Sequence, residues 1–292
     1  MRFIILGDLH YAASADPVVA ASRDHFFEGL FRQVAAQRAD LVFAIGDTTQ
    51  RGTVEELSAQ TALLQRAGLD LIRLTGNHDS DSLAKAELAS FFLGGRDSAS
   101  PDELYTSFDA GPVRFVLLDT ARSRSTNWSG FVSDEQLAWL DNQIARYNQA
   151  GAPRHIVVMG HHPIMNTTRR SDERWFNIEN SPAVEAVLTR LTRGAGIYAC
   201  GHNHINSLAG PDAQGWYYIQ VGAPLVCRSY GLFMVDEAGI RFEKVDIDLT
   251  DPRFRADYDV TRLSQGADFN EFPFEHMYGA ESDHRLRIPA TL

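Results

Sequence analysis

Residues 69–79 read Leu69-Asp70-Leu71-Ile72-Arg73-Leu74-Thr75-Gly76-Asn77-His78-Asp79, an apolar run that leads into a polar turn. The apolar part is typical of a short buried strand. The turn offers an amide, an imidazole and a carboxylate in consecutive side chains, at the place where the strand should end. Such a turn can be purely structural, because asparagine tolerates the left-handed backbone of tight turns. It gains meaning from the other strand ends of the chain.

Four further apolar runs, at residues 3–6, 41–45, 155–159 and 197–200, each end in a glycine that precedes a polar residue. The polar residues there are Asp8 with His10, Asp47, His161, and His202 with His204. Ligands gather beyond the carboxyl ends of strands in parallel sheets, so we predict that these side chains form one site with Asn77 and His78. The set has nitrogen and oxygen donors and no thiolate, which favours Mn, Fe, Co or Zn.

Strands and helices alternate along residues 1–92. Asp16-Pro17 and the pair Thr53 with Glu56 are typical of helix starts. They predict a helix over residues 17–38 and a second of about fifteen residues after Thr53. A third helix is predicted around residues 81–92. Alternation of this kind predicts βαβ units and a mostly parallel sheet.

The second half of the chain has a different pattern. Residues 104–118 predict a hairpin around Ala110-Gly111-Pro112, and Ser133 with Gln136 forms another capping box. A helix is expected after Ser181-Pro182, and short alternating runs between residues 205 and 246 predict antiparallel strands. Two facing mixed sheets flanked by helices account for both halves. The predicted fold class is therefore α/β, a four-layer α-β-β-α sandwich.

We assign residues 1–246 to one domain and residues 247–292 to a C-terminal tail. The tail shows neither a helical nor a strand period, so we expect it to be irregular. Its large apolar side chains indicate that it docks onto something, either as a cap over the site or as an arm in a homo-oligomer. They are Phe254, Tyr258, Phe269, Phe272, Phe274, Met277 and Tyr278.

Composition limits the partners. The 292 residues carry a formal net charge of −11, which disfavours nucleic-acid polymers but not a small anion held by metal ions. The two cysteines argue against a disulfide framework and for a reduced compartment. The first apolar run is too short for a signal peptide, and no run approaches the ~20 residues that span a bilayer. We therefore expect a cytoplasmic protein with no membrane segment.

The polar strand ends, taken in order, resemble the calcineurin-like metallophosphoesterase superfamily. The matching motifs are Asp8-Leu9-His10, Gly46-Asp47, Gly76-Asn77-His78-Asp79, Gly160-His161 and Gly201-His202-Asn203-His204. The resemblance implies two divalent transition-metal ions and makes residues 1–246 the catalytic domain. One ion would be held by Asp8, His10, Asp47 and His204, and the other by Asp47, Asn77, His161 and His202.

The resemblance also implies a mechanism. Asp47 would bridge the two ions, and a metal-bound hydroxide would attack phosphorus in line. His78 would act on the leaving oxygen as a proton donor or charge stabiliser, while Asp79 would orient the His78 ring.

Three segments resemble the bacterial class III cyclic-nucleotide and glycerophosphodiester phosphodiesterases. They are Leu118-Asp119-Thr120, residues 136–140 and Gly160-His161-His162-Pro163. The sequence lacks the tyrosine that follows the bridging aspartate in purple acid phosphatases, and it lacks the paired arginines of protein Ser/Thr phosphatases. We therefore predict a phosphodiesterase for a small phosphodiester. A phosphomonoesterase, a nuclease and a non-catalytic scaffold stay open as alternatives.

Two polar loops, at residues 119–132 and 165–180, are expected to wall the site. Trp128 and Trp175 in these loops are candidates for stacking on a base or covering a glycerol, although large aromatic side chains more often serve packing. His162 either contacts the substrate or is a buried histidine that supports the ligands. The sequence favours neither interpretation for His162.

Overall fold

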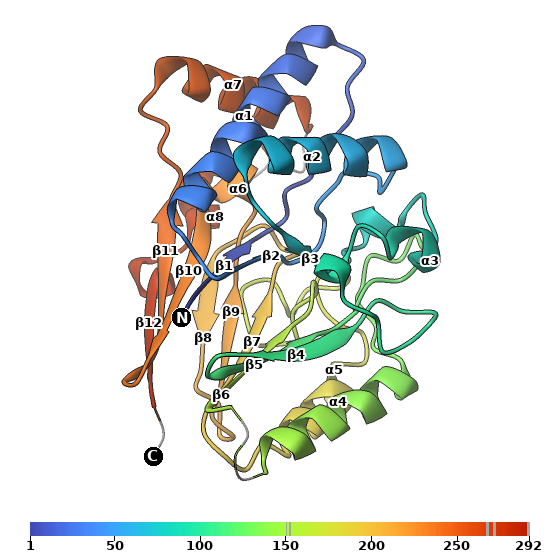
Figure 1. Cartoon of the computed structure of the whole chain (residues 1–292), viewed down its shortest axis with the longest axis vertical. Coiled ribbons are helices and arrows are strands. Elements are labelled where there is room, and N and C mark those ends of the chain that lie inside the picture. Colours follow the sequence, from blue (N-terminus) through green and yellow to red (C-terminus); the bar gives the residue numbers. More distant parts are fainter. Residues whose placement is uncertain (150, 152, 267–268, 271–272, 291–292) are drawn as a thin grey trace.

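Two six-stranded sheets face each other in a computed structural model of the chain, and helices cover both outer sides (Figure 1). The structure describes residues 1–149, 151, 153–266, 269–270 and 273–290. The first sheet contains, in order, β12 (Arg285–Pro289), β11 (Gly239–Asp246), β10 (Ser229–Asp236), β1 (Arg2–Leu6), β2 (Leu41–Ala44) and β3 (Ile72–Arg73). The second contains β4 (Thr106–Ala110), β5 (Val113–Leu117), β6 (His155–Met159), β7 (Gly196–Cys200), β9 (Trp216–Gln220) and β8 (Ser207–Ala209). The predicted four-layer sandwich is confirmed.

Each sheet contains a set of neighbouring parallel strands. In the first sheet β1, β2 and β3 are parallel, and in the second β5, β6, β7 and β9 are parallel. Strand β3 is shorter than predicted, at two residues, although Leu74 still donates its backbone N–H to Ala44. The predicted antiparallel pairing after residue 205 holds for β10 with β11 and for β8 with β9, but β9 also runs parallel to β7.

Helices α1 (Pro17–Ala36), α2 (Val54–Ala67) and α7 (Pro252–Ser264) lie beyond the first sheet, while α4 (Asp134–Tyr147) and α5 (Ser181–Leu188) cover the second (Figure 1). The N-caps predicted at Asp16, Thr53 and Ser133 form, because each side chain accepts a hydrogen bond from the first turn. Among the described residues, no helix combines the length and the apolar character needed to cross a membrane.

The helix predicted around residues 81–92 is confirmed only for one turn. Within this range the chain forms the one-turn helix α3 (Lys85–Leu88), and 3₁₀ turns lie on either side of the range, η1 (His78–Ser80) and η2 (Leu93–Gly95). The side chains of Ser80 and Ser82 donate to backbone carbonyls of Gly76 and Arg51, and such local bonds compete with a regular helix.

Aromatic rings fill the space between the two sheets. The Phe3 ring stacks on Phe233 with centroids 4.4 Å apart and meets Phe115 edge-on at 5.1 Å. Each sheet is also separated from the helices on its outer side by one further apolar layer. Because these layers fix both sheets, the strand ends that carry the polar turns have fixed positions relative to each other.

The prediction of an irregular tail is also wrong. Helix α7 packs along α1, α8 (Phe274–Tyr278) and the 3₁₀ turn η4 (Glu281–Asp283) follow, and β12 pairs antiparallel with β11. Tyr258 is buried, and its hydroxyl donates to the Leu225 carbonyl at 2.8 Å. Phe272 lies outside the described residues. The tail is therefore part of the fold for most of its length.

Gly29 lets α1 and α7 come into close contact. A methyl group at Gly29 would lie 2.3 Å from Cε2 of Phe254. Alanine normally favours a helix over glycine by ~1 kcal/mol. Here we expect Gly29→Ala to lower the free energy of unfolding by about 1–3 kcal/mol, because the core would be overpacked. Urea denaturation measures the change.

The control is Gly29→Ala introduced into a protein that already carries Phe254→Ala. With the ring removed, Gly29→Ala should no longer destabilise the protein. An equal cost in both backgrounds would show that the two helices do not meet at Gly29.

Candidate metal centre

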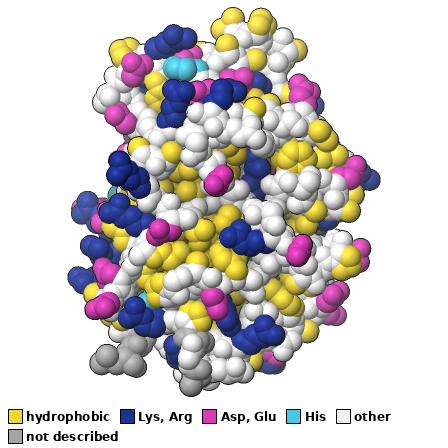
Figure 2. Space-filling model, in the orientation of Figure 1, with side chains coloured by type: hydrophobic (Ala, Val, Ile, Leu, Met, Phe, Trp, Pro, Cys, Tyr) yellow, Lys and Arg dark blue, Asp and Glu magenta, His cyan; other side chains and the backbone are white. Residues whose placement is uncertain are grey.

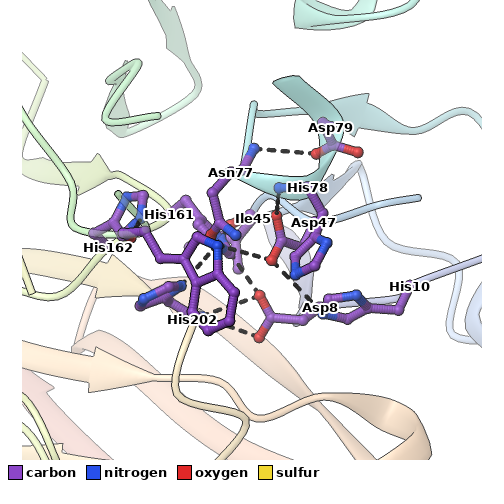
Figure 3. A network of polar contacts seen from close by, with 12 residues as sticks. Asp8, His10, Ile45, Asp47, Asn77, His78, Asp79, His161, His162 and His202 are labelled. Atoms are coloured by element: carbon purple, nitrogen blue, oxygen red, sulfur yellow. Dashed lines mark hydrogen bonds and ion pairs between the residues drawn. The ribbon is translucent and has the colours of Figure 1, made fainter. Parts of the chain in front are cut away.

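The predicted ligands converge at the carboxyl ends of the parallel strands. Figure 3 shows the side chains of Asp8, His10, Asp47, Asn77, His161 and His202 pointing toward one another. The seventh, His204, has its Nε2 atom 3.0 Å from Nε2 of His10. The turns after β1, β2, β3, β6 and β7 all contribute, so the structure brings together every ligand that the sequence suggested.

The ligand atoms have the spacing that metal ions require. Nε2 of His161 lies 3.2 Å from Oδ1 of Asn77, 3.2 Å from Oδ2 of Asp47 and 3.3 Å from Nδ1 of His202. Oδ2 of Asp47 is also 3.6 Å from Nε2 of His10, so it lies between the two sets of histidines. Bonds of about 2.0–2.1 Å to a common ion place neighbouring ligand atoms at roughly 3–3.5 Å from one another.

Hydrogen bonds on the outer side fix which nitrogen of each ring faces inward. Nδ1 of His10 donates to Oε1 of Gln50 at 2.8 Å, and Nδ1 of His161 donates to the Ile45 carbonyl at 3.0 Å. Nε2 of His202 donates to the Trp175 carbonyl at 2.9 Å. The opposite nitrogen of each ring is left as a lone-pair donor toward the cluster. The residues therefore fit a pair of cations.

The backbone at this site is strained. His10, Asp47, His202 and His204 have φ angles of 47°, 46°, 70° and 55°. These left-handed values are uncommon for residues other than glycine, and they persist where surrounding contacts enforce them, often at functional sites. Four of the seven ligands are held in this way.

Charges within the cluster shift the pKa values of its members. Burial raises the pKa of Asp8 to about 7, with a further contribution from Asp47 and opposition from His161. Burial alone would lower the pKa of His161, but the Asp47 carboxylate raises it to about 9. Burial lowers the pKa of His10 and of His202 to about 3. Without a metal, the cluster therefore keeps protons on Asp8 and His161 that cations would displace.

His78 lies at the open side of the cluster. Its Nδ1 donates to the Gln50 carbonyl at 2.9 Å, its backbone N–H donates to Oδ1 of Asp47, and its side chain is 26% exposed. Burial opposes protonation, but Asp47 and the Gln50 carbonyl raise the pKa of His78 above its ordinary value. The Nε2 atom is thus free to face a substrate and tends to carry a proton.

Asp79 does not orient the His78 ring, so that prediction is wrong. Its carboxylate accepts hydrogen bonds from the backbone N–H and the hydroxyl of both Thr48 and Thr49, and from the N–H of Gly76. The Gln50 carbonyl holds the ring instead. Asp79 therefore joins the turn after β3 to the turn that carries Asp47.

His162 supports the site from behind. It is fully buried, its Nδ1 accepts from the Thr120 hydroxyl at 2.8 Å, and its Nε2 donates to the Trp128 carbonyl at 2.9 Å. Because both nitrogens are occupied, His162 is not available to contact substrate. Of the two interpretations offered by the sequence, the structure favours the supporting histidine.

Trp128 and Trp175 lie at the rim. The two residues are 47% and 44% exposed, and their ring centroids are 6.2 Å apart. The backbone carbonyl of Trp128 accepts a hydrogen bond from His162, and that of Trp175 accepts one from His202. Both tryptophans are therefore linked to the cluster. Trp175 also lines a cavity of about 370 Å³ with Arg174 and Glu179.

Gln50 is the residue that sequence reasoning missed. The Gln50 side chain accepts a hydrogen bond from His10, and its backbone carbonyl accepts one from His78. One residue therefore orients two histidines. A glutamine three positions after Asp47 carries no local signal for this task, because both contacts depend on the tertiary fold.

The fold and the ligand set together define the class of protein. The profile of the family described as calcineurin-like phosphoesterase matches residues 1–206. The chain therefore belongs to this family, and it is a metal-dependent phosphoric ester hydrolase.

Individual relatives have related activities. A protein of Rhodopseudomonas palustris named as a probable cyclic nucleotide phosphodiesterase is 26% identical over 207 residues, which cover 70% of this chain and 72% of the relative. The human serine/threonine-protein phosphatase CPPED1 is 25% identical over 228 residues, covering 71% and 70%. A crystal structure of a dimetal phosphatase from Danio rerio has the same fold, with a TM-score of 0.69 at 18% identity over 84% of this chain and 97% of that one.

Metal binding should release protons. Ligands must be deprotonated to bind, and in the metal-free protein the pKa values of Asp8 and His161 are about 7 and about 9. We expect Mn²⁺ affinity to rise with pH, with about two protons released near pH 6 and about one near pH 8. Calorimetric titration in buffers of different ionisation enthalpy counts them. Release of no protons at either pH would contradict this electrostatic account.

Replacing Gln50 should weaken the metal site while leaving the fold intact. Gln50→Ala removes the acceptor for Nδ1 of His10, and we expect Mn²⁺ affinity to fall by about 10- to 100-fold. Gln50→Glu keeps an acceptor oxygen and should retain affinity. Gln65→Ala, at an exposed position of α2, is the matched control. Equal affinities in all these variants would mean that His10 needs no external support.

Proposed function

We propose that this chain is a phosphodiesterase that hydrolyses a small phosphodiester, such as a cyclic nucleotide or a glycerophosphodiester, with two divalent transition-metal ions. The observation that carries the proposal is the position of Asp47, whose Oδ2 lies between two groups of inward-facing histidines. Asp8, His10 and His204 would hold one ion with Asp47. Asn77, His161 and His202 would hold the other.

The donor set suits Mn, Fe, Co or Zn, because imidazole and carboxylate are combined without a thiolate. When bound, a pair of such ions polarises phosphoryl oxygens and lowers the pKa of water, so that a nucleophile is available near neutral pH. The remaining steps depend on the protein's own side chains.

His78 is proposed as the proton donor to the leaving alcohol. Its Nε2 has no intramolecular partner among the described contacts, and Asp47 favours its protonated form. A donor with a pKa near the working pH is effective in general acid catalysis. The Gln50 carbonyl keeps the ring in the orientation that leaves Nε2 toward the cluster.

A diester is favoured by the surface beside the ligands. Trp128 and Trp175 expose aromatic rings next to the cluster, where a second ester group would lie. A phosphomonoester has no such group to place there. The cyclic nucleotide phosphodiesterase named among the relatives gives further support.

The alternatives have less support. The human relative named as a protein phosphatase keeps a phosphomonoesterase as the second candidate. A nuclease is disfavoured by the net charge of −11, and on the face drawn in Figure 2 basic side chains are interspersed with acidic ones. A non-catalytic scaffold would have no need for a partly exposed His78, with its pKa raised by Asp47, beside a full set of candidate ligands.

The cytoplasm stays our proposed location. Cys200 and Cys227 are both free and buried, which suits a reduced compartment. A homo-oligomer formed through the tail also stays a prediction.

Comparison of two chromogenic esters tests the proposal. We expect Mn-loaded protein to hydrolyse bis(p-nitrophenyl) phosphate faster than p-nitrophenyl phosphate. His78→Ala is the control for the site, and it should lower turnover of the diester by roughly 10²- to 10⁴-fold with the bound Mn unchanged. A preference for the monoester would favour the phosphatase instead. Unchanged turnover in His78→Ala would remove this histidine from the mechanism.

A further inference from the structure

The C-terminal tail reaches the metal centre through one aromatic side chain. Phe269 is 3% exposed, and its ring centroid lies 4.8 Å from that of His10 and 4.9 Å from that of His204. The Phe269 ring meets the His10 ring edge-on, with an interplanar angle of 82°. The Phe269 and His204 rings are tilted by 33° relative to each other. Phe269 therefore touches the two histidines whose Nε2 atoms face each other.

The tail also holds the backbone of His10. Gln265, at the end of α7, donates from Nε2 to the His10 carbonyl at 2.9 Å. The left-handed conformations of His10 and His204 need support from outside the turn, because each costs energy in isolation. Ring and backbone contacts from the same segment supply that support.

The tail is anchored on both sides of Phe269. Before it, α7 packs along α1, with Phe254 and Tyr258 buried. After it, the Met277 carbonyl accepts a hydrogen bond from the N–H of Asn206, close in sequence to His204. Phe269 is thus held in place by elements that do not belong to the metal centre.

Different residues contact the other half-site, which contains Asn77, His161 and His202. His202 is bounded by the Trp175 carbonyl and by the Phe176 ring, whose centroid is 5.8 Å from that of the histidine. Both belong to the loop at residues 165–180, next to the exposed tryptophans. One half-site is therefore contacted by a packed tail and the other by a loop at the rim.

We propose that Phe269 is a positioning residue that fixes His10 and His204 within the half-site of Asp8, His10, Asp47 and His204, so that this half-site releases its ion more slowly than the other. The ring contacts both imidazoles and fixes their orientation, and a fixed orientation of the ligand rings strengthens metal binding. The inference rests on the proposed two-metal function and assigns a role to the tail within it.

Chelator-induced release of Mn²⁺ tests the inference without measuring activity. Protein loaded with Mn²⁺ is mixed with excess EDTA, and the released ion is followed by electron paramagnetic resonance. We expect two phases in the unmodified protein. Phe269→Ala should accelerate the slow phase by about 10- to 100-fold and leave the fast phase unchanged. Phe269→Leu, which keeps an apolar side chain, should restore part of the slow release.

Phe176→Ala is the matched control, because it removes an aromatic contact from the other half-site. It should alter the fast phase alone. A general loss of stability would change both phases together, which would contradict a positioning role. If Phe269→Ala does not fold, Gln265→Ala removes the hydrogen bond to His10 and should accelerate the slow phase in the same way.

The outcomes separate this inference from the function on which it rests. If the Phe269→Ala variant binds two ions and releases both at the rates of the unmodified protein, the proposed role of Phe269 is overturned, while the two-metal proposal is not affected. Fewer than two Mn²⁺ ions bound by the unmodified protein would overturn the two-metal proposal, and the role of Phe269 with it.

Discussion

The carboxylate of Asp47 is the group on which the site depends. Its Oδ1 accepts from the backbone of His78, and its Oδ2 lies between His161 and His10. This position requires very close backbone approach. A methyl group at Gly76 would lie 2.1 Å from Oδ1 of Asp47, so only glycine fits there. These contacts of the Asp47 carboxylate explain why the turns after β2 and β3 meet, and the Asp79 carboxylate joins the same two turns through its hydrogen bonds.

The polar strand ends could be predicted because local rules determine them. Apolar runs predict buried strands, and the ends of parallel strands in an α/β sheet meet at one edge. That reasoning predicted that the side chains at these strand ends lie together, and the structure brings them together. The roles of Asp79 and Gln50 could not be derived in the same way, because their partners are set by how one turn lies against another. The buried position of His162 depends likewise on the distant Thr120 and Trp128.

Local signals were misleading where tertiary contacts compete with them. Glu56 and Gln136 were expected to complete capping boxes. Instead, Glu56 accepts from the N–H of Ala13 and Arg51, and Gln136 bonds to the backbone of Asp119. Both side chains thus brace loops around the metal centre. In the tail a local signal does hold, because Asp251-Pro252 begins α7 in the same way as Asp16-Pro17 begins α1.

The strand order of the first sheet has a consequence for synthesis of the chain. Strand β1, which leads to Asp8, pairs with β10, and Phe3 lies opposite Phe233. The ligands are complete once His204 has been made, yet β10, β11, α7 and β12 all follow it. A chain still attached to the ribosome at that stage carries every ligand on an unfinished sheet. Stable capture of metal is therefore expected to follow synthesis of β10, β11, α7 and β12, when these elements can pack.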